Sequence, residues 1–580
     1  MMRLMNQITE KPGWDKKVFD ETIASKWKSE ALSTTDQTGQ PIDLTEKMFE
    51  YCISELRYKA TLFENTGLVV AFDGDVVKSD SVVPEELRLS LKTAAAALEN
   101  IPDSHRDWHP GSNDTVLDLV HPSLFPVVYG TTRILKHTTV DLENCVAQCG
   151  NGMVLPVPPA DITGARRTFF SRNKRDPYSK KFQWLPCEVE FKSDGGVKIA
   201  SYINNLHPDK NKPLYAAIEK VIDKAIILWN HTLNPLSDPN ATTVRITFDG
   251  PVYGDIANIP IDQRPPQLAG EDDDAYEQRI TEMAIIVPEP GVFVEPGSKE
   301  EYKAREELNA PKMEFSTGVS AGEGAGAEDA LEDGGVALNW SLQRPLLNLG
   351  EKFKDRGLQV IVKLANIHLT PDKPEYAGGT WHVEGQLNEH ICATALYYYD
   401  CENITESRLA FRQQSHGTED ISYAQDWHRW LHDIYGFTNA DATVQYLGEV
   451  CSQEGRLLTF PNIFQHRVEP FRLADSTQPG HRKILALFLV DPHIRVISSA
   501  NVPCQRRDWW QEEVERSRAL PKSLPLEMKR EIVGHMEDED FPMSIEEAKK
   551  LRLELMEERK SYGGMQDRSF NGTRFSLCEH

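Results

Sequence analysis

The stretch Leu358-Gln-Val-Ile-Val-Lys-Leu-Ala-Asn-Ile-His-Leu369 decides the predicted fold. It is a nearly continuous run of residues that favour β-strands. Comparable runs follow at residues 390–399, 457–460, 484–490 and 494–497, and a helix is predicted at residues 422–435. Several strands with one helix in this part of the chain predict a β-rich core, either a sandwich or a barrel.

Helical patterns flank this core. Apolar residues recur at helical spacing at residues 43–64, 84–97 and 213–233. Ser544-Ile-Glu-Glu547 has the form of a capping box and predicts a charged helix that runs to about residue 560. Short strands are predicted at residues 125–129, 188–191 and 244–248, and an acidic loop at residues 270–278. The predicted fold class is therefore α+β.

The predicted organisation has five parts. They are a helical N-terminal region (1–101), a mixed α/β region that packs on the barrel (116–315), an acidic Gly/Ala-rich flexible insertion (316–335), a metal-binding barrel domain (345–510) and a charged helical extension (511–580). No internal repeat is evident.

Charge and hydropathy exclude several classes of protein. The chain has 580 residues, with 64 Lys+Arg against 89 Asp+Glu and a net charge of −25. Such acidity disfavours nucleic acid and anionic membranes as general partners. No apolar run approaches the roughly 18 residues that a membrane-spanning helix needs, and the N-terminus lacks the apolar stretch of a secretory signal. We expect an intracellular protein, cytoplasmic or nuclear.

Cysteine usage agrees with an intracellular location. The nine cysteines are odd in number and scattered, which disfavours a disulfide framework. Cys145 and Cys149 form one close pair, but structural zinc sites usually have two such pairs.

The sharpest local pattern is Gly378-Gly-Thr-Trp-His382-Val-Glu384-Gly385. Along a strand, residues i and i+2 point to the same face, so His382 and Glu384 can present an imidazole and a carboxylate side by side. The later run from Gly455 closes on His466. Two histidines and one carboxylate on one face of a metal are the ligand set of non-haem iron(II) oxygenases. The alternative is a hydrogen-bonded His382–Glu384 pair at a barrel mouth, with His466 capping a turn.

A basic pair enters the strand predicted at residues 484–490. In Gly480-His-Arg482-Lys483, a cation at the start of an apolar strand is costly unless an anion meets it. A guanidinium can grip a carboxylate through two hydrogen bonds, which suits the distal carboxylate of a dicarboxylic cosubstrate. Strand parity does not choose between Arg482 and Lys483, because the following residues are apolar on both faces. Arg472 is a further competitor.

The order His-x-Glu, His, Gly-x-Arg resembles the 2-oxoglutarate- and iron(II)-dependent dioxygenases on the double-stranded β-helix, a jelly-roll or cupin-like barrel. The resemblance implies that His382, Glu384 and His466 bind Fe(II) and that Arg482 holds 2-oxoglutarate. Tyr376 lies where a cosubstrate-contacting tyrosine would lie, with barrel-rim packing as its alternative role. Glu replaces the more usual Asp, and Arg482 lies farther beyond His466 than is usual, so the loop 470–479 must bulge out.

Two further resemblances concern the barrel and the whole chain. The run from Gly455 through Pro461 and Ile463 to His466 is similar to the second cupin motif, which agrees on His382 and His466 as ligands but not on the need for 2-oxoglutarate. Three strings, at residues 182–187, 201–208 and 379–385, resemble a fungal family of unknown function. That resemblance extends to about Trp510 and implies no activity.

The sequence thus leads to one main hypothesis and two alternatives. The main hypothesis is a 2-oxoglutarate-dependent oxygenase of the hydroxylase type, acting on a small-molecule or protein substrate. The first alternative is a non-catalytic β-barrel scaffold that binds a protein partner. The second is a cupin-like metalloenzyme that does not use 2-oxoglutarate.

Overall fold

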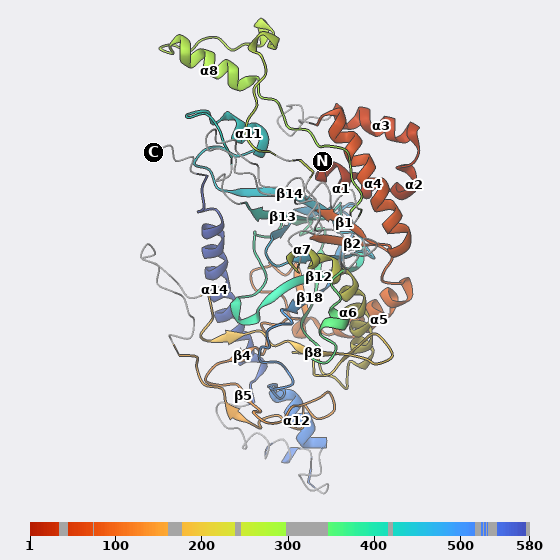
Figure 1. The fold of residues 1–580 in the computed structure, drawn as a ribbon. Coiled ribbons are helices and arrows are strands. Elements are labelled where there is room, and N and C mark those ends of the chain that lie inside the picture. The colour runs from red at the N-terminus through yellow and green to blue at the C-terminus, as the bar shows by residue number, and fades with distance from the viewer. Residues whose placement is uncertain are drawn as a thin grey trace, which may run out of the picture.

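The strand predicted at residues 358–369 lies in the middle of a large antiparallel sheet in the computed structural model (Figure 1). The structure describes all residues except 34–43, 73–74, 160–176, 238–244, 247, 297, 299–345, 416–420, 517–523, 526, 529–530, 532–541 and 576–580. The predicted 316–335 insertion lies outside the described residues.

The large sheet has the strand order β1-β2-β15-β12-β18-β10-β8-β9, and β3 also pairs with β10. Its strands are β1 (Val69–Phe72), β2 (Val76–Ser79), β3 (Val116–Val120), β8 (Cys187–Phe191), β9 (Val197–Ile199), β10 (Leu358–Leu369), β12 (Ile391–Glu402), β15 (Leu457–Pro461) and β18 (Gly480–Val490). The region predicted to be helical, 1–101, therefore also contributes two strands to this sheet.

A smaller sheet has the order β14-β13-β16, formed by Val444–Cys451, Arg408–Gln414 and Gln465–Val468. Three two-stranded ribbons complete the strands of the described residues. They pair β11 (Glu375–Tyr376) with β17 (Phe471–Arg472), β4 (Val127–Val128) with β7 (Phe182–Gln183), and β5 (Arg133–Ile134) with β6 (Met153–Val154).

The large sheet is covered on both faces, which explains its nearly continuous apolar strands. Alternate residues of β18 separate cleanly: Leu485, Leu487 and Leu489 pack with the helices, whereas Ala486, Phe488 and Val490 pack with the smaller sheet. Phe411 of β13 and Phe460 of β15 meet in that second core, with ring centroids 5.1 Å apart. The two sheets therefore face each other across a shared apolar interior.

Helices surround the sheets. Met2–Thr9 (α1), Trp14–Lys17 (α2), Glu21–Leu32 (α3) and Glu46–Thr66 (α4) form the N-terminal group, Glu85–Glu99 (α5) and Lys212–Thr232 (α6) cover the large sheet, and Ile545–Phe570 (α14) runs along the opposite side of the molecule (Figure 1). Shorter helices are Asn234–Ser237 (α7), Asp273–Met283 (α8), Leu349–Lys352 (α10), Arg429–Tyr435 (α11) and Arg507–Arg516 (α12). Short 3₁₀ turns are Asp103–His105 (η1), Ile256–Asn258 (η3), Ile261–Gln263 (η4) and Leu387–Glu389 (η5).

The strongest helix predictions are confirmed by α4, α5, α6 and α14, although α14 continues past its predicted end near residue 560 to Phe570. The capping box at the start of α14 is present, because Ser544 Oγ accepts the Glu547 N–H while the Glu547 carboxylate accepts the Ser544 N–H. In α6 the apolar spacing buries one whole face, including Trp229, which has no exposed surface. These elements combine helix and antiparallel sheet, which confirms the α+β class.

Several predicted strands were wrong. The stretch 494–497 forms no strand, because the Gln359 side chain bonds both backbone groups of Val496 in place of a strand partner. The stretch 125–129 shrinks to β4, since Phe125 adopts a left-handed φ of 51°. The described residues of 244–248 carry no strand either.

Two predictions about helices need correction as well. The acidic stretch 270–278 begins helix α8 rather than a loop, because the Asp272 carboxylate caps the Ala275 N–H and the following aspartates favour a helix N-terminus. The helix expected at 422–435 begins only at Arg429, after Asp426 with a left-handed φ of 63°.

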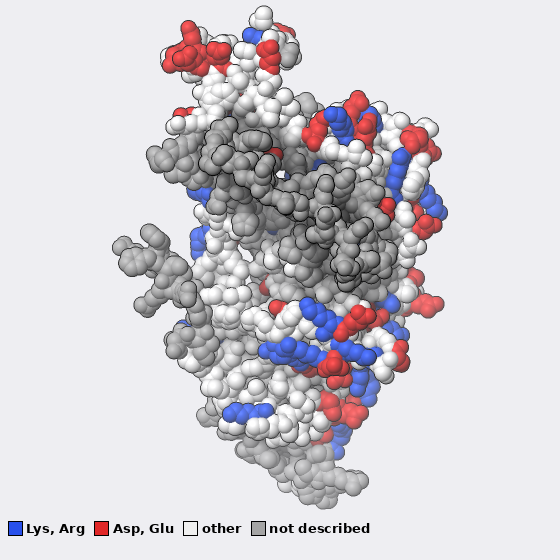
Figure 2. Space-filling view, in the orientation of Figure 1, with Lys and Arg blue, Asp and Glu red and all other residues white. Residues whose placement is uncertain are grey.

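The surface charge is uneven. Figure 2 shows acidic side chains gathered on the projecting α8 segment and both signs interspersed over the N-terminal helices. No helix within the described ranges combines the length and the apolarity needed to cross a membrane. Cys145 and Cys149 are buried free thiols, Cys145 lies in a small apolar cluster, and burial raises the pKa of Cys149 to about 12.

Candidate metal centre

His382 and His466 face each other across an antiparallel backbone contact. His382 donates its backbone N–H to the carbonyl of His466 at 3.2 Å, and His466 donates to the carbonyl of His382 at 3.0 Å. His466 lies in β16, whereas His382 lies in the loop between β11 and η5. Their ring centroids are 4.4 Å apart. The fold thus joins two histidines that lie in separate segments of the sequence.

Glu384 places its carboxylate next to both rings. Its Oε1 lies 3.3 Å from Nε2 of His466 and 3.7 Å from Nε2 of His382. Nδ1 of His382 lies 2.7 Å from the carbonyl of Thr380. Because a carbonyl only accepts, Nδ1 carries the hydrogen and Nε2 of the neutral ring is available to a metal. One ligand atom from each of the three residues lies within 4.8 Å of the others, so one cation can contact all three.

Burial and mutual charge set the protonation of the three groups. Burial alone would raise the pKa of Glu384, but the adjacent imidazoles of His382 and His466 hold it well below its usual range. Burial would lower the pKa of His382, yet the Glu384 carboxylate and the Thr380 carbonyl raise it. Burial and the charge of His382 lower the pKa of His466. At neutral pH Glu384 is therefore ionised and His466 neutral, as metal ligands must be.

The cluster is closed on one side and open on the other. The side chain of His466 is 5% exposed and packs on Phe460, with ring centroids 4.7 Å apart. The side chain of His382 is 41% exposed. Its neighbour Trp381 lies between two guanidinium groups, 4.6 Å from that of Arg412 and 4.7 Å from that of Arg467. Solvent therefore reaches the cluster past His382, beside a fixed aromatic ring.

Arg482 and Lys483 separate to opposite faces of the large sheet. Lys483 faces the helices, where its ammonium lies 2.9 Å from Glu99 of α5 and 3.1 Å from Asp400. Burial would lower the pKa of Lys483, but these two carboxylates raise it. Its charge is thus already compensated by the fold, and we do not retain Lys483 as an anion anchor.

Arg482 points into the interior between the sheets and is only 3% exposed. Its Nη1 donates to Ser407 Oγ at 2.6 Å, and its guanidinium lies 5.6 Å from the ring centroid of Tyr398 and 5.1 Å from that of Phe471. Within the described part of the chain, its Nε has no hydrogen-bond partner and no carboxylate pairs with it. A buried cation in this state is costly unless an anion meets it.

Tyr376 packs against the same phenylalanine. Its ring packs on Phe471 at 5.2 Å, and β11 and β17 pair through these two residues. Burial raises the pKa of Tyr376, while the nearby charge of Arg482 acts to lower it. Tyr376 is therefore part of the wall around Arg482. The other competitor, Arg472, is exposed on β17.

These residues lie within a segment that matches a family model. The model described as "Protein of unknown function (DUF4246)" matches residues 46–513, and one described as "Domain of unknown function DUF4246, N-terminal" matches residues 1–30. The chain belongs to the DUF4246 family. This confirms the resemblance to an uncharacterised family over nearly the whole chain. No curated protein matches the DUF4246 chain.

Three solved structures share partial similarity with the DUF4246 chain. IDO from Bacillus thuringiensis is 12% identical, covering 23% of this chain and 47% of its own, with a TM-score of 0.15. A bsmA homolog from Methylobium petroleophilum PM1 is 17% identical over 25% and 49%, with a TM-score of 0.15. The Fe(II)/(alpha)ketoglutarate-dependent dioxygenase TqaL is 14% identical over 24% and 46%, with a TM-score of 0.15. Each match covers about half of the neighbour's length, and TM-scores this low carry no argument.

A second group of metal-capable side chains in the DUF4246 chain comprises His109, Asp118 and His121. His109 Nδ1 lies 2.8 Å from Asp118 Oδ2, and Nη1 of Arg552 lies 3.6 Å from the same oxygen. Nδ1 of His121 accepts the Ser123 N–H at 3.1 Å. A neutral ring that accepts there carries its proton on Nε2, so it has no lone pair left for a metal. We therefore assign this group to a hydrogen-bonded network that joins β3 to α14.

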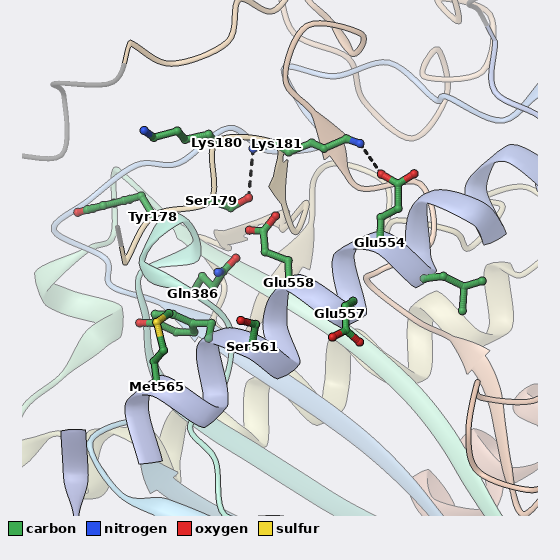
Figure 3. Close-up of a pocket in the computed structure, with 12 residues that line it drawn as sticks. Tyr178, Ser179, Lys180, Lys181, Gln386, Glu554, Glu557, Glu558, Ser561 and Met565 are labelled. Carbon is green, nitrogen blue, oxygen red and sulfur yellow. Dashed lines mark hydrogen bonds and ion pairs between the residues drawn. The ribbon is translucent and has the colours of Figure 1, made fainter. Parts of the chain in front are cut away.

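A groove of about 810 Å³ lies between α14 and residues 178–181 (Figure 3). Lys181 reaches across its rim and pairs with Glu554 of α14. Gln386, just after Glu384 in the chain, lines the groove, but none of His382, Glu384 and His466 does. The groove thus flanks the loop that carries Glu384.

Proposed function

We propose that this protein is a non-haem iron(II)- and 2-oxoglutarate-dependent oxygenase. The observation that carries the proposal is the meeting of His382, Glu384 and His466 within 4.8 Å in a fold that also buries Arg482 without a carboxylate partner among the described residues. Two histidines and one carboxylate that leave further metal positions open are the ligand set of non-haem iron(II) oxygenases.

The three residues fit a divalent metal in their chemistry. Nε2 of His382 and Nε2 of His466 both lie beside Oε1 of Glu384, so two imidazoles and one carboxylate converge on one point. A cation there would compensate the negative charge of the ionised Glu384. The exposed side of His382 leaves a path by which the metal and further ligands enter.

Arg482 fits the far carboxylate of 2-oxoglutarate. Its Nε, which has no partner among the described residues, and the Ser407 hydroxyl offer donors, and a guanidinium binds a carboxylate through two parallel hydrogen bonds. Tyr398, Phe471 and Tyr376 surround this position with aromatic surface. Such surroundings exclude water and strengthen the ion pair.

The arrangement of strands supports a double-stranded β-helix as the core. The central strands β15-β12-β18-β10 face the smaller sheet β14-β13-β16 across one apolar interior. His466 contributes to that interior through Phe460, and Arg482 does so through Tyr398. In this account metal and cosubstrate occupy one space between the two sheets.

In the proposed reaction, residues of this chain bind the metal, orient the cosubstrate and shield it from water. A bound iron(II) ion with 2-oxoglutarate would supply oxidation by dioxygen. Glu384 holds a negative charge at the centre, and the Thr380 carbonyl fixes the His382 tautomer. Arg482 orients the cosubstrate, and the aromatic rings keep water away from it.

The proposal is tested by anaerobic titration of the purified protein with iron(II) and then with 2-oxoglutarate, followed by absorption spectroscopy. We expect 2-oxoglutarate to change the spectrum of the iron-loaded protein, and aerobic incubation to yield succinate. If the spectrum of the bound metal does not change when 2-oxoglutarate is added, the protein is a metalloenzyme that does not use this cosubstrate. Absence of any stoichiometric metal would instead indicate a non-catalytic scaffold.

A further inference from the structure

Asn462 holds the backbone of Glu384 from both sides. Its Oδ1 accepts the Glu384 N–H at 2.8 Å, and its Nδ2 donates to the Glu384 carbonyl at 2.9 Å. The two residues are 78 positions apart in the chain. Asn462 lies in the turn between β15 and β16, directly ahead of the strand that carries His466. One amide side chain thus ties the segment of one proposed ligand to that of another.

Glu384 depends on such an external support. The antiparallel contact with β16 involves Gly379 and His382 but not Glu384, and the residues around Glu384 form a bend. Gly385 follows with a left-handed φ of 69°, and a Cβ there would lie 2.9 Å from Ile391. No regular ladder therefore fixes the backbone that orients the Glu384 carboxylate. The Asn462 amide supplies the two hydrogen bonds that a neighbouring strand would otherwise make.

The turn that carries Asn462 is itself anchored to the large sheet. The Asn462 N–H donates to the Cys392 carbonyl at 2.9 Å, and Nδ2 also donates to the Ile391 carbonyl at 3.1 Å. Both partners lie at the start of β12, a central strand. Asn462 therefore connects the backbone of Glu384 to a central strand of the large sheet.

We infer that Asn462 is the positioning residue that sets the metal affinity of the site by fixing Glu384 relative to His466. The inference rests on the proposed function, since it takes His382, Glu384 and His466 to be metal ligands. It adds a residue that touches neither metal nor cosubstrate. Groups that orient metal ligands typically contribute about 10- to 100-fold to metal affinity.

The chain offers a matched control in Asn388. Its Oδ1 accepts the Ser179 N–H at 2.6 Å and its Nδ2 donates to the Ser179 carbonyl at 2.9 Å. The bonding is the same as that between Asn462 and Glu384, but Ser179 belongs to no proposed ligand segment. Asn388→Ala therefore removes two backbone hydrogen bonds from a loop that does not bear a ligand, whereas Asn462→Ala removes the same two kinds of bond from Glu384 and a third from Ile391.

The test compares wild type, Asn462→Ala and Asn388→Ala in two measurements. Isothermal titration with Co(II) gives the metal dissociation constant, and hydrogen exchange of the metal-free protein reports the Glu384 amide. We expect Asn462→Ala to weaken Co(II) binding about 10- to 100-fold and to expose the Glu384 amide to exchange. Asn388→Ala should leave both unchanged. Asn462→Asp, which keeps the acceptor for the Glu384 N–H but not the two donors, serves if the alanine variant does not fold.

The possible outcomes separate this inference from the proposed function. Wild-type Co(II) affinity in both Asn462 variants would overturn the positioning role and leave the metal site standing. A wild-type protein without Co(II) binding would overturn the proposed function, and with it the effect of Asn462 on metal affinity. The exchange measurement would in that case still decide whether Asn462 fixes Glu384.

Discussion

Arg482 and Lys483 are neighbours in β18, yet their cationic groups lie on opposite faces of the large sheet. Lys483 is paired with Glu99 and Asp400 on the helix side. Arg482 lies between the sheets, bonded to Ser407 and to no carboxylate of the described residues. We therefore expect replacement of Arg482 and replacement of Lys483 to have different effects on cosubstrate binding and on stability.

Arg482→Gln should weaken 2-oxoglutarate binding strongly. Hydrogen bonds to a charged group contribute about 1.5–3 kcal/mol, so we expect a loss of about 10- to 150-fold in affinity. Lys483→Gln should leave 2-oxoglutarate binding unchanged and should instead lower the free energy of unfolding, because it leaves Asp400 short of one cation. Calorimetric titration of the metal-loaded variants measures the first effect and urea denaturation the second. Equal 2-oxoglutarate affinity in the wild type and the Arg482 variant would contradict the assigned anchor.

Metal binding should depend on pH through His382. A metal binds the neutral imidazole, and the Glu384 carboxylate raises the pKa of His382 above its usual value. Protons therefore compete as pH falls through this raised pKa, and affinity is greatest above it. We expect Co(II) affinity to fall about tenfold per pH unit below that point, since one proton is displaced. His466 adds little to the effect, because its own pKa is lowered. Affinity that stays constant from about pH 8 to about pH 6 would contradict this assignment.

A buried ion pair should contribute strongly to the attachment of the C-terminal helix. Arg559 of α14 lies 2.6 Å from Glu389, which has no exposed surface, and its guanidinium stacks 3.7 Å from the ring centroid of Trp184. Arg559→Ala leaves that buried carboxylate without its cation and should cost about 3–5 kcal/mol of unfolding free energy.

The matched control is Glu554→Ala in the same helix, which breaks the exposed contact with Lys181. Exposed pairs contribute little, so its denaturation midpoint should stay close to that of the wild type. Equal midpoints for both variants would show that α14 does not depend on the pair with Glu389.

Helices and strands were predicted best from the sequence where their local residue pattern agrees with their packing in the fold. Helices α4, α5, α6 and α14 carry caps or a single apolar stripe, and β10 has the bounds predicted for it. Strand parity could not assign Arg482 and Lys483 to one face or the other. The large sheet is buried on both faces, so the residues of β18 that follow them are apolar on both. At residues 494–497 a distant side chain, Gln359, takes the place of a strand partner.

The grouping of His382, Glu384 and His466 could be predicted from the sequence, but the residue that supports this group could not. His382, Glu384 and His466 have residue types and an order that point to a metal, and the structure brings them together. The role of Asn462 depends on contacts with a segment 78 positions away, which no local spacing shows. Likewise, the resemblance to a known motif gave no reason to single out Trp381, which two guanidinium groups hold in place.

The most direct test of the account is the iron content of the protein after anaerobic loading with iron(II) and desalting. Wild type should retain one iron per chain, and a His382→Ala/His466→Ala double variant should retain none. A His109→Ala/His121→Ala double variant should still retain one, because that group is a structural network whose rings are already hydrogen-bonded. Full iron retention by the His382→Ala/His466→Ala variant would contradict the proposed metal centre.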